Sequence, residues 1–426
     1  MWKFLVNIFA VIVTSCFIFP FFPTFMPMIN TKMALAAIGL VILGNNWAKS
    51  KDAMINRQVF VMTLYALLVG LVSLFSETYH GTGGNIYVTL FISMWVWIGA
   101  AYTVSQLIRW IHGEVTVQLF FNYVILVCVF QCIIAVTKEY YPPLKMMVDS
   151  LVSGEGFMGK AGNRLYGIGA ALDVAGLRFS AVLVIITYLC VNLKESERRW
   201  KLIWYMIAYF IIVLLGNMMS RSTTIGFIIS IGYLGYAVLF KQTQKENAMA
   251  FGKYFLGILA VILPVLVLLY YVDDTFYKNI RFAFEGFFNW WEHGEYKNKS
   301  NSILLHMIVW PDNWQSWLIG DGYFAQPDLV DPYYLGPRYG GFYKGTDIGY
   351  CLFIFYFGLI GLACMVAYIC KAAFCGMERF PMYKGMFLML LAINLIGWCK
   401  VSTDIFPIFA PFLIIPAATM QKDSSL

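Results

Sequence analysis

The sequence predicts an all-α polytopic membrane protein with about twelve transmembrane helices and one large loop outside the membrane. Of its 426 residues, 60% are hydrophobic and 12% are charged, and the mean hydropathy is +0.71. Soluble domains carry about 25% charged residues. Apolar windows of about 20 residues, the length that crosses a bilayer as a helix, recur from end to end. One long polar stretch, residues 273–346, interrupts them.

The predicted spans are apolar runs bounded by polar or charged residues, with ends placed to within about two to four residues. The first lacks an Ala-x-Ala cleavage site, so we expect a retained span rather than a signal peptide. The spans lie near 4–22, 33–46, 58–76, 86–108, 117–137, 176–193, 202–219, 222–240, 254–272, 348–370, 385–400 and 404–420.

Positive charge predicts the orientation of these spans. Lysine and arginine concentrate in alternate connections, and Lys3 and Lys422 place both termini on the same side. By the positive-inside rule this side is cytoplasmic. The net charge of +7 follows from this topology, so it gives no argument for a nucleic-acid partner.

The long loop 273–346 is therefore expected outside the cytoplasm, between nine spans in 1–272 and three in 347–426. A loop of this length is usually functional. We expect it to contain short helices and to cover a lipid-facing cavity. The nine cysteines avoid its body, and no Cys or His spacing resembles a metal site, so we expect no metal or cofactor.

Positive charge also lies on the external side, against the topology rule. A single such residue can snorkel to lipid headgroups, and Arg178 and Arg221 lie closest to the hydrocarbon. Several together favour an anionic ligand, because arginine offers a bidentate fork to phosphate oxygens. These residues are Lys138, Lys145, Lys160, Arg164, Arg178, Arg221, Lys278, Arg281, Arg338 and Lys344.

Two short motifs carry external arginines. Arg164-Leu165-Tyr166-Gly167 opens a glycine-rich segment that ends at Asp173, where the backbone can approach a bound group closely. The alternative is an interfacial turn before a helix. Ser220-Arg221-Ser222 joins two apolar runs almost without a loop. Such a turn needs only small polar residues, so the arginine indicates function, and a helix N-terminus after it also favours an anion.

The long loop and its exit carry candidate sugar-binding and catalytic residues. The loop is rich in aromatic residues, including Trp310 and Trp317, whose faces suit stacking on sugar rings, although interfacial packing also accounts for them. His306 lies in an amphipathic stretch and can simply face water. Asp347 falls where water meets the start of a span, so it can cap a helix or act on a hydroxyl.

These elements together resemble the O-antigen polymerases (Wzy) and, more distantly, the O-antigen ligases (WaaL). Ligases usually carry a His-Asn pair near the loop exit, where this chain has Asp347-Ile348, and this difference favours a polymerase. His306 occupies a place where such proteins often carry arginine. The resemblance rests on Arg164-x-x-Gly167, the Ser220-Arg221 turn, Gly320-Asp321-Gly322, and the loop exit Thr346-Asp347-Ile348-Gly349-Tyr350 with Gly358-Leu359-Ile360-Gly361.

The resemblance implies a GT-C-like glycosyltransferase that joins undecaprenyl-pyrophosphate-linked repeat units at the periplasmic face of the bacterial inner membrane. The growing glycan is the donor, and a hydroxyl of a new lipid-linked unit attacks its anomeric carbon. A chain-length regulator and a flippase are the expected partners. The implied roles are pyrophosphate binding by Arg164, Arg221, Arg281 and Arg338, catalysis by Asp347 or His306, and sugar binding by Trp310, Trp317, Tyr323 and Tyr350.

Other functions stay open. An O-antigen ligase, which transfers glycan to the lipid A-core, is the nearest alternative. A flippase or transporter of lipid-linked oligosaccharide explains the spans but not the single large loop, and it predicts internal symmetry with ionisable residues in mid-membrane. A structural subunit needs neither the external arginines nor the aromatic loop.

Overall fold

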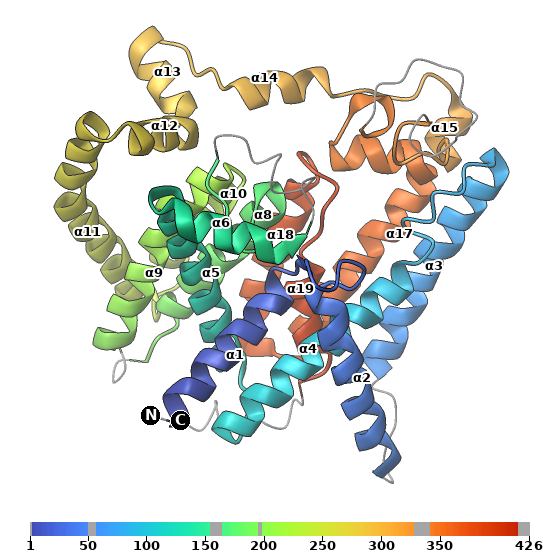
Figure 1. The fold of residues 1–426 in the computed structure, drawn as a ribbon, viewed down its shortest axis with the longest axis horizontal. Coiled ribbons are helices and arrows are strands. Elements are labelled where there is room, and N and C mark those ends of the chain that lie inside the picture. The colour runs from blue at the N-terminus through green and yellow to red at the C-terminus, as the bar shows by residue number, and fades with distance from the viewer. Residues whose placement is uncertain (1, 50–56, 154–163, 195–197, 328–340, 416–426) are drawn as a thin grey trace. The chain divides into compact units, whose positions relative to one another are not determined.

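The computed structural model describes residues 2–49, 57–153, 164–194, 198–327 and 341–415, which are nearly all helical (Figure 1). Eight of the described helices are long and apolar enough to cross a membrane. Three shorter apolar helices cover Trp2–Ile18, Thr31–Asn46 and Pro381–Gly397. The chain therefore has the helices that a polytopic membrane protein needs, as its composition predicts.

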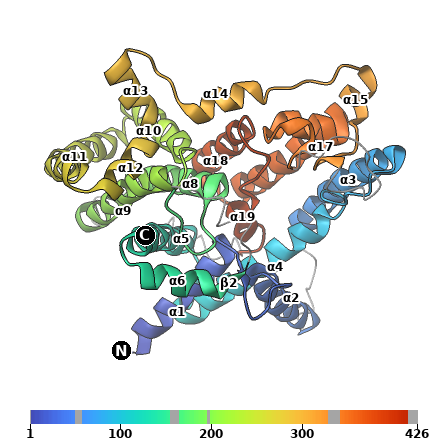
Figure 2. The same cartoon turned by 45° about the horizontal axis from the view of Figure 1, so that its top comes forward.

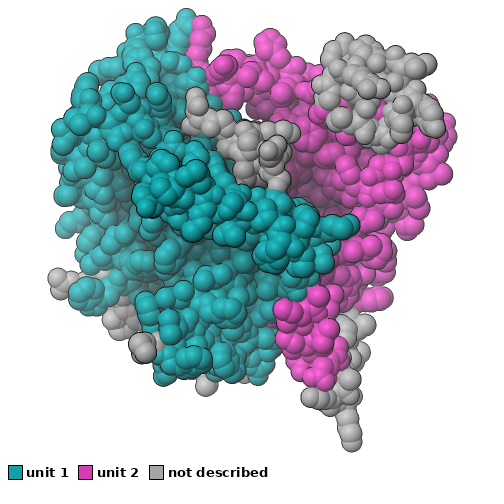
Figure 3. All heavy atoms as spheres, in the orientation of Figure 1, with its two compact units in different colours: residues 1–35, 103–296, 416–426 teal, residues 36–102, 297–415 magenta. Residues whose placement is uncertain are grey.

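The chain divides into two compact units, which Figure 3 colours separately. Unit 1 comprises residues 1–35, 103–296 and 416–426, and unit 2 comprises residues 36–102 and 297–415. Helices α2 (Thr31–Lys49) and α4 (Leu90–His112) each contribute to both. The polar stretch 273–346 is also shared, because residues up to 296 belong to unit 1 and the rest to unit 2.

Unit 1 is built from helices and one minimal pair of strands. Strands β1 and β2 are antiparallel, with Phe22 opposite Ser153 and Pro23 opposite Val152, so they join the end of α1 to the end of α6. The elements are α1 (Trp2–Ile18), β1 (Phe22–Pro23), α5 (Val117–Tyr140), α6 (Pro142–Leu151), β2 (Val152–Ser153), α8 (Leu172–Val191), α9 (Arg198–Met219), α10 (Thr223–Phe240), α11 (Lys245–Val272), α12 (Asp274–Ala283) and α13 (Glu285–His293).

Helix α8 forms the core of unit 1. Every residue from Ala175 to Val191 is buried, and the helix packs against α5, α9 and α10 (Figure 2). A helix that is apolar on all sides is stable only when it is enclosed in this way. The ends of α8 and its neighbours therefore hold a fixed frame for the polar segments that precede and follow them.

Arg178 of α8 is part of that core. Its side chain is 5% exposed and donates a hydrogen bond to the carbonyl of Ile18, the last residue of α1. The guanidinium lies 5.5 Å from the centre of the Phe19 ring. Because the carbonyl end of a helix attracts a cation, this arginine ties α1 to α8. The alternative that Arg178 snorkels to lipid headgroups is therefore wrong.

Unit 2 combines long apolar helices with the short helices of the polar loop. Its core lies where α17 packs against α3, α15 and α18. Besides its shares of α2 and α4, the elements are α3 (Arg57–His80), α14 (Lys299–His306), α15 (Trp314–Ile319), the 3-10 helix η3 (Tyr343–Gly345), α17 (Gly349–Arg379), η4 (Pro381–Tyr383), α18 (Lys384–Gly397), α19 (Phe406–Phe409) and η5 (Ala410–Leu413).

Helix α17 is broken inside the predicted span of 348–370. Phe357 and Gly358 have non-helical backbone angles, and the φ of Gly358 is +69°, a conformation that residues with a side chain rarely adopt. The backbone of Leu318 in α15 packs so closely on Gly358 that a side chain would not fit there. The break therefore requires glycine at this position.

The Gly320-Asp321-Gly322 turn occupies this break. The backbone N–H of Asp321 donates to the carbonyl of Phe355 at 2.6 Å, and that of Gly322 donates to the carbonyl of Tyr356 at 3.2 Å. Since a broken helix leaves such carbonyls without intrahelical partners, these bonds stabilise the break. The Gly320-Asp321-Gly322 segment is therefore built into the side of a long apolar helix.

The last predicted span, 404–420, is not one continuous helix over its described part. Only the short helices α19 and η5 lie there, with Pro407 in the first and Pro411 in the second. Proline has no backbone N–H to donate and restricts the preceding residue, so a long helix is not favoured.

Candidate functional site

Arg164 and Arg221, which are 57 residues apart in the printed sequence, approach one aromatic ring in unit 1. The guanidinium carbon of Arg221 lies 4.5 Å from the centre of the Phe282 ring, and that of Arg164 lies 5.0 Å from it. Cations within about 6 Å of a ring face are attracted to it. We call Arg164, Arg221, Phe282 and the ion-paired Glu285 the arginine site.

The turn that carries Arg221 is held by hydrogen bonds to the carboxylate of Asp173. Helix α9 ends at Met219 and α10 begins at Thr223, so the predicted tight turn is confirmed. Asp173, in the first turn of α8, accepts hydrogen bonds from the hydroxyls of Ser220 at 2.9 Å and Ser222 at 2.5 Å. Both serines are buried. The small polar residues therefore fix the backbone, while the arginine between them contacts α12 and α13.

Arg221 is held by charge as well as by the ring. Its guanidinium forms an ion pair with the carboxylate of Glu285, the first residue of α13. The side chain of Arg221 is 13% exposed and that of Glu285 is 28% exposed. A partly buried ion pair of this kind fixes the direction of the guanidinium.

Arg281 forms a second pair within unit 1. Its guanidinium makes two hydrogen bonds to Glu292, one of 2.8 Å, and donates to the Tyr270 hydroxyl at 3.3 Å. It also lies 4.9 Å from the centre of the Phe288 ring. The hydrogen bonds from Arg281 lower the pKa of Glu292, and those to Glu292 raise the pKa of Arg281. Both groups therefore stay charged over the ordinary pH range.

An apolar cavity of about 760 Å³ in unit 1 is lined by residues that bond to Arg281 or flank the Arg221 turn, while the arginines themselves are not part of its lining. Its walls come from α9, α10, α11, α12 and α13. Tyr270 and Glu292, which bind Arg281, belong to its lining, as do Asn217 and Thr224 on either side of the Arg221 turn. The rest is mostly Leu, Ile, Val, Phe and Trp. The one charged residue among the described residues of the lining is Glu292, and through it and Tyr270 the cavity is linked to the guanidinium of Arg281. An apolar pocket next to a cation suits a ligand with an anionic head and an apolar body.

The predicted sugar-binding residues of unit 2 fall into separate aromatic pairs. Trp310 and Trp317 stack at 5.7 Å, and the Trp317 indole donates to the carbonyl of Pro311 at 2.9 Å. Tyr323 stacks on Tyr343 at 5.3 Å. The rings of each pair face one another, so in this conformation aromatic packing uses the surfaces that a sugar would need.

Tyr350, also predicted to bind sugar, is tied to the end of α18. Its hydroxyl donates to the carbonyl of Leu395 at 2.9 Å, and its ring meets that of Trp398 edge to face. These contacts give Tyr350 a packing role between α17 and α18 in this conformation.

The two candidate bases occupy different surroundings in unit 2. His306 is the last residue of α14 and is exposed. Asp347 is partly buried and lies two residues before the start of α17. The cap position of α17 is Ile348, whose N–H donates to the hydroxyl of Thr346 at 3.3 Å. Asp347 is therefore not the capping residue, which weakens the structural alternative for it. Arg338 and Lys160 lie outside the described residues.

Arg164 and Arg221 are the sequence-predicted site residues that the structure brings to one ring, and Arg281 lies in the same unit with its own carboxylate partner. Sequence reasoning misses Phe282, Glu285 and Asp173. Asp173 is the last residue of the glycine-rich segment that begins at Arg164, so the sequence indicates its position but not its bonds to the two serines. Phe282 and Glu285 carry no local signal, because only the fold of α12 and α13 against the turn selects them.

Comparison of the chain with protein-family models, with curated proteins and with solved structures finds no match. Any functional conclusion therefore rests on the chemistry of the residues described above.

Proposed function

We propose that this protein is a membrane glycosyltransferase that polymerises undecaprenyl-pyrophosphate-linked oligosaccharide repeat units into O-antigen or a similar surface polysaccharide. The reaction takes place at the external face of the bacterial inner membrane. The observation that supports this proposal is the arginine site of unit 1, together with an apolar cavity of the same unit whose lining includes Asn217 and Thr224 on either side of the Arg221 turn.

A lipid pyrophosphate has the two properties that this arrangement can bind. Its head is a strong polyanion, for which arginine offers planar, always-charged donors. Its polyprenyl tail is apolar and suits the wall of leucine, isoleucine, valine and phenylalanine in the cavity. The volume of about 760 Å³ falls within the range of roughly 300–1,000 Å³ of small-molecule sites, so it holds part of a long tail while the remainder stays in the bilayer.

The carboxylates of Glu285 and Glu292 fit the same proposal. Each balances an arginine in the resting protein, and each lies in α13, outside the long apolar helices. When a pyrophosphate arrives, each arginine exchanges its carboxylate partner for a group of higher negative charge. Because both states pair the arginines, the positive groups keep an anionic partner throughout.

In the proposed reaction the hydroxyl of a new lipid-linked unit attacks the anomeric carbon of the growing chain. The carbon–oxygen bond to the lipid pyrophosphate breaks, and Arg164 and Arg221 stabilise the charge that develops on that leaving group. Asp347 accepts or orients the proton of the attacking hydroxyl, with His306 as the alternative base. The family resemblance further assigns charge compensation to Arg281 and Arg338 and glycan binding to Trp310, Trp317, Tyr323 and Tyr350. The full set of spans, a GT-C-like arrangement and a periplasmic active face belong to this proposal.

A strain that lacks the gene tests this function directly. Its lipopolysaccharide should carry single repeat units, and a plasmid copy of the gene should restore the ladder of long chains. Polymer that accumulates on the carrier lipid would instead identify a ligase, and repeat units trapped in the cytoplasmic leaflet would identify a transporter. Purified protein mixed with lipid-linked repeat units should form a ladder of carrier-linked chains without other proteins.

A further inference from the structure

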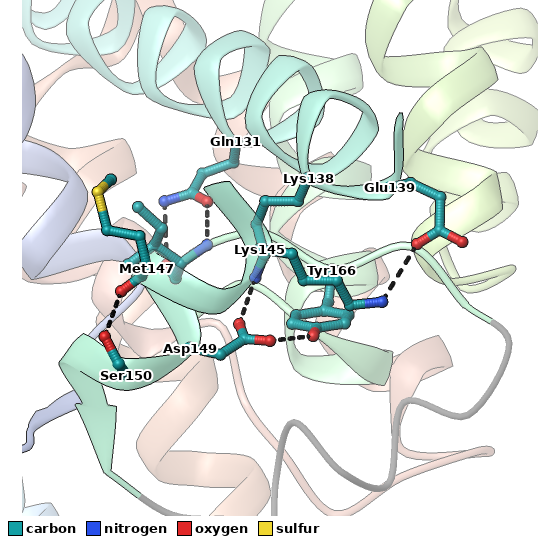
Figure 4. A network of polar contacts seen from close by, with 9 residues as sticks. Gln131, Lys138, Glu139, Lys145, Met147, Asp149, Ser150 and Tyr166 are labelled. Atoms are coloured by element: carbon teal, nitrogen blue, oxygen red, sulfur yellow. Dashed lines mark hydrogen bonds and ion pairs between the residues drawn. The ribbon is translucent and has the colours of Figure 1, made fainter. Parts of the chain in front are cut away.

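Asp149 of α6 joins two residues of different segments in unit 1. Its Oδ1 accepts a hydrogen bond from the Nζ of Lys138 at 2.7 Å, and its Oδ2 accepts one from the hydroxyl of Tyr166 at 2.7 Å (Figure 4). The Nζ of Lys138 also lies 3.9 Å from the centre of the Tyr166 ring. Three residues from the end of α5, from α6 and from the segment before α8 thus form one cluster, which we call the Tyr166 clamp.

Burial separates this clamp from an ordinary surface ion pair. The side chain of Lys138 is 2% exposed, whereas its partner Asp149 is 34% exposed. Burying an ammonium group is costly unless it is paired and hydrogen-bonded, so the carboxylate and the ring together make the position tolerable. The neighbouring pair of Lys145 and Glu139 is open to solvent and 3.5 Å apart, and such pairs contribute little.

A second set of bonds holds the residues just after Tyr166. The side-chain amide of Gln131 donates to the carbonyl of Ile168 at 3.0 Å and accepts from its N–H at 2.8 Å. Gly167 lies so close to the Gln131 amide oxygen that a side chain there would overlap it. Figure 4 shows Gln131 and Lys138 extending from the same helix, α5, toward this segment. The segment from Tyr166 to Ile168 is therefore held by Gln131 of α5 at Ile168 and, through the Tyr166 hydroxyl, by Asp149 of α6.

Arg164 is two residues before this fixed point, and its guanidinium lies 5.0 Å from the centre of the Phe282 ring. If this segment were flexible, the Arg164 side chain would occupy many positions. A site that stabilises developing charge is most effective when its hydrogen-bond donors are already fixed in place before the reaction. Given the proposed function, we infer that Asp149, Lys138 and Tyr166 are positioning residues that hold Arg164 in the arginine site for the lipid pyrophosphate.

The test uses Tyr166→Phe, which keeps the ring under Lys138 and removes only the hydroxyl bonded to Asp149. Asp149→Asn is less suitable on its own, because it takes the countercharge from the buried Lys138 and so destabilises the folded protein. Farnesyl pyrophosphate is the probe, titrated into the purified full-length protein in detergent. Glu139→Gln is the matched control, since it removes a carboxylate from the exposed pair beside the clamp.

A double-mutant cycle distinguishes positioning from general stabilisation. We expect Tyr166→Phe to weaken farnesyl pyrophosphate binding about tenfold in the wild-type background, and by less than about twofold in an Arg164→Ala background. Glu139→Gln should bind like the wild type. Melting temperatures of all variants, measured in the same detergent, show whether each remains folded. Equal weakening by Tyr166→Phe in both backgrounds, or no weakening at all, overturns the positioning role.

The same titration separates this inference from the proposed function. If the wild type binds the probe and both Arg164→Ala and Arg221→Ala weaken it, the anion site stands whatever Tyr166→Phe does. If the wild type does not bind, or if Arg164→Ala binds as tightly as the wild type, the arginine site is not a pyrophosphate site and the positioning role fails with it.

Discussion

Arg221 and Glu285 form an ion pair across 64 positions of sequence. The pair joins the tight turn between α9 and α10 to the first residue of α13, so the polar helices after α11 are bonded to the helical core of unit 1. Since the ring of Phe282 lies against the same guanidinium, Arg221 has one defined direction before any ligand arrives.

Replacement of Arg221 should remove most polymerisation. Arg221→Lys keeps the charge but loses the planar fork, and Arg221→Ala loses both, so we expect partial and nearly complete loss respectively. Loss of one donor from a preorganised site costs on the order of 3 kcal/mol of activation free energy, or roughly a hundredfold in rate. Polymer length on lipopolysaccharide gels from a complemented deletion strain measures the effect. Lys299→Ala, at the exposed first residue of α14, is the control for lost positive charge. If Arg221→Ala is present at the normal level and still makes polymer of normal length, the proposal that this turn binds an anion is wrong.

Removal of the competing carboxylate should have the opposite effect on binding. In Glu285→Gln the guanidinium of Arg221 keeps its place on Phe282 but no longer has an anionic partner to exchange, so farnesyl pyrophosphate should bind several-fold tighter. The melting temperature should fall slightly, because α13 loses its bond to the turn. Titration of the purified variant beside the wild type measures the first effect. Weaker binding would mean that Glu285 chiefly orients Arg221.

Sequence reasoning finds the parts of the fold that depend on averages along the chain. The eight long apolar helices fall on predicted spans, because hydropathy summed over about 20 residues decides whether a helix suits a bilayer. The Arg221 turn is also predictable, since two apolar runs meet there with three polar residues between them.

What escapes sequence reasoning depends on single residues brought together by the fold. The break of α17 at Gly358 lies inside a continuous apolar run and is selected by the approach of Leu318. The sequence places Arg178 near the predicted membrane edge, yet its side chain is buried and donates a hydrogen bond to the carbonyl of Ile18 at the end of α1. The pairing of Lys138 with Asp149 likewise needs the turn between α5 and α6, which the sequence pattern leaves open.

The pair of Arg281 and Glu292 should make α12 and α13 sensitive to acid. Hydrogen bonds from Arg281 hold the pKa of Glu292 below its ordinary value, and the nearby His293 adds a smaller effect in the same direction. The stabilisation is therefore complete above the ordinary glutamate pKa of about 4.3 and is lost as the pH falls through the lowered value. Tryptophan emission, with Trp290→Phe and Trp291→Phe to identify the signal, should change below about pH 4 but not between pH 7 and 5. In Glu292→Gln this acid transition should be absent.

Asp347 should matter through its charge. Asp347→Asn preserves size and most hydrogen bonding, and the capping position of α17 is Ile348, so the variant should reach the membrane normally. We expect the rate of polymerisation to fall by about a hundredfold, which is the lower end of the range for the loss of one general base. His306→Ala, at the exposed end of α14, ranks the alternative base in the same assay. Full-length polymer from Asp347→Asn combined with loss in His306→Ala would transfer the role to the histidine.

The side of the membrane on which the polar stretch 273–346 lies is open to a direct labelling test. The charge pattern predicts the external side, so a cysteine on α14 should react with a membrane-impermeant maleimide in intact spheroplasts. Asn301 is the suitable position because it is exposed, whereas Asn298 is buried and caps the helix by accepting from the N–H of Ser300. The background must lack the exposed Cys399. A cysteine at Lys245, the first residue of α11 at its predicted cytoplasmic end, is the opposite control and should react only after lysis. If the Asn301→Cys protein is protected until lysis while Lys245→Cys is labelled at once, the orientation is inverted and the arginine site cannot serve a periplasmic reaction.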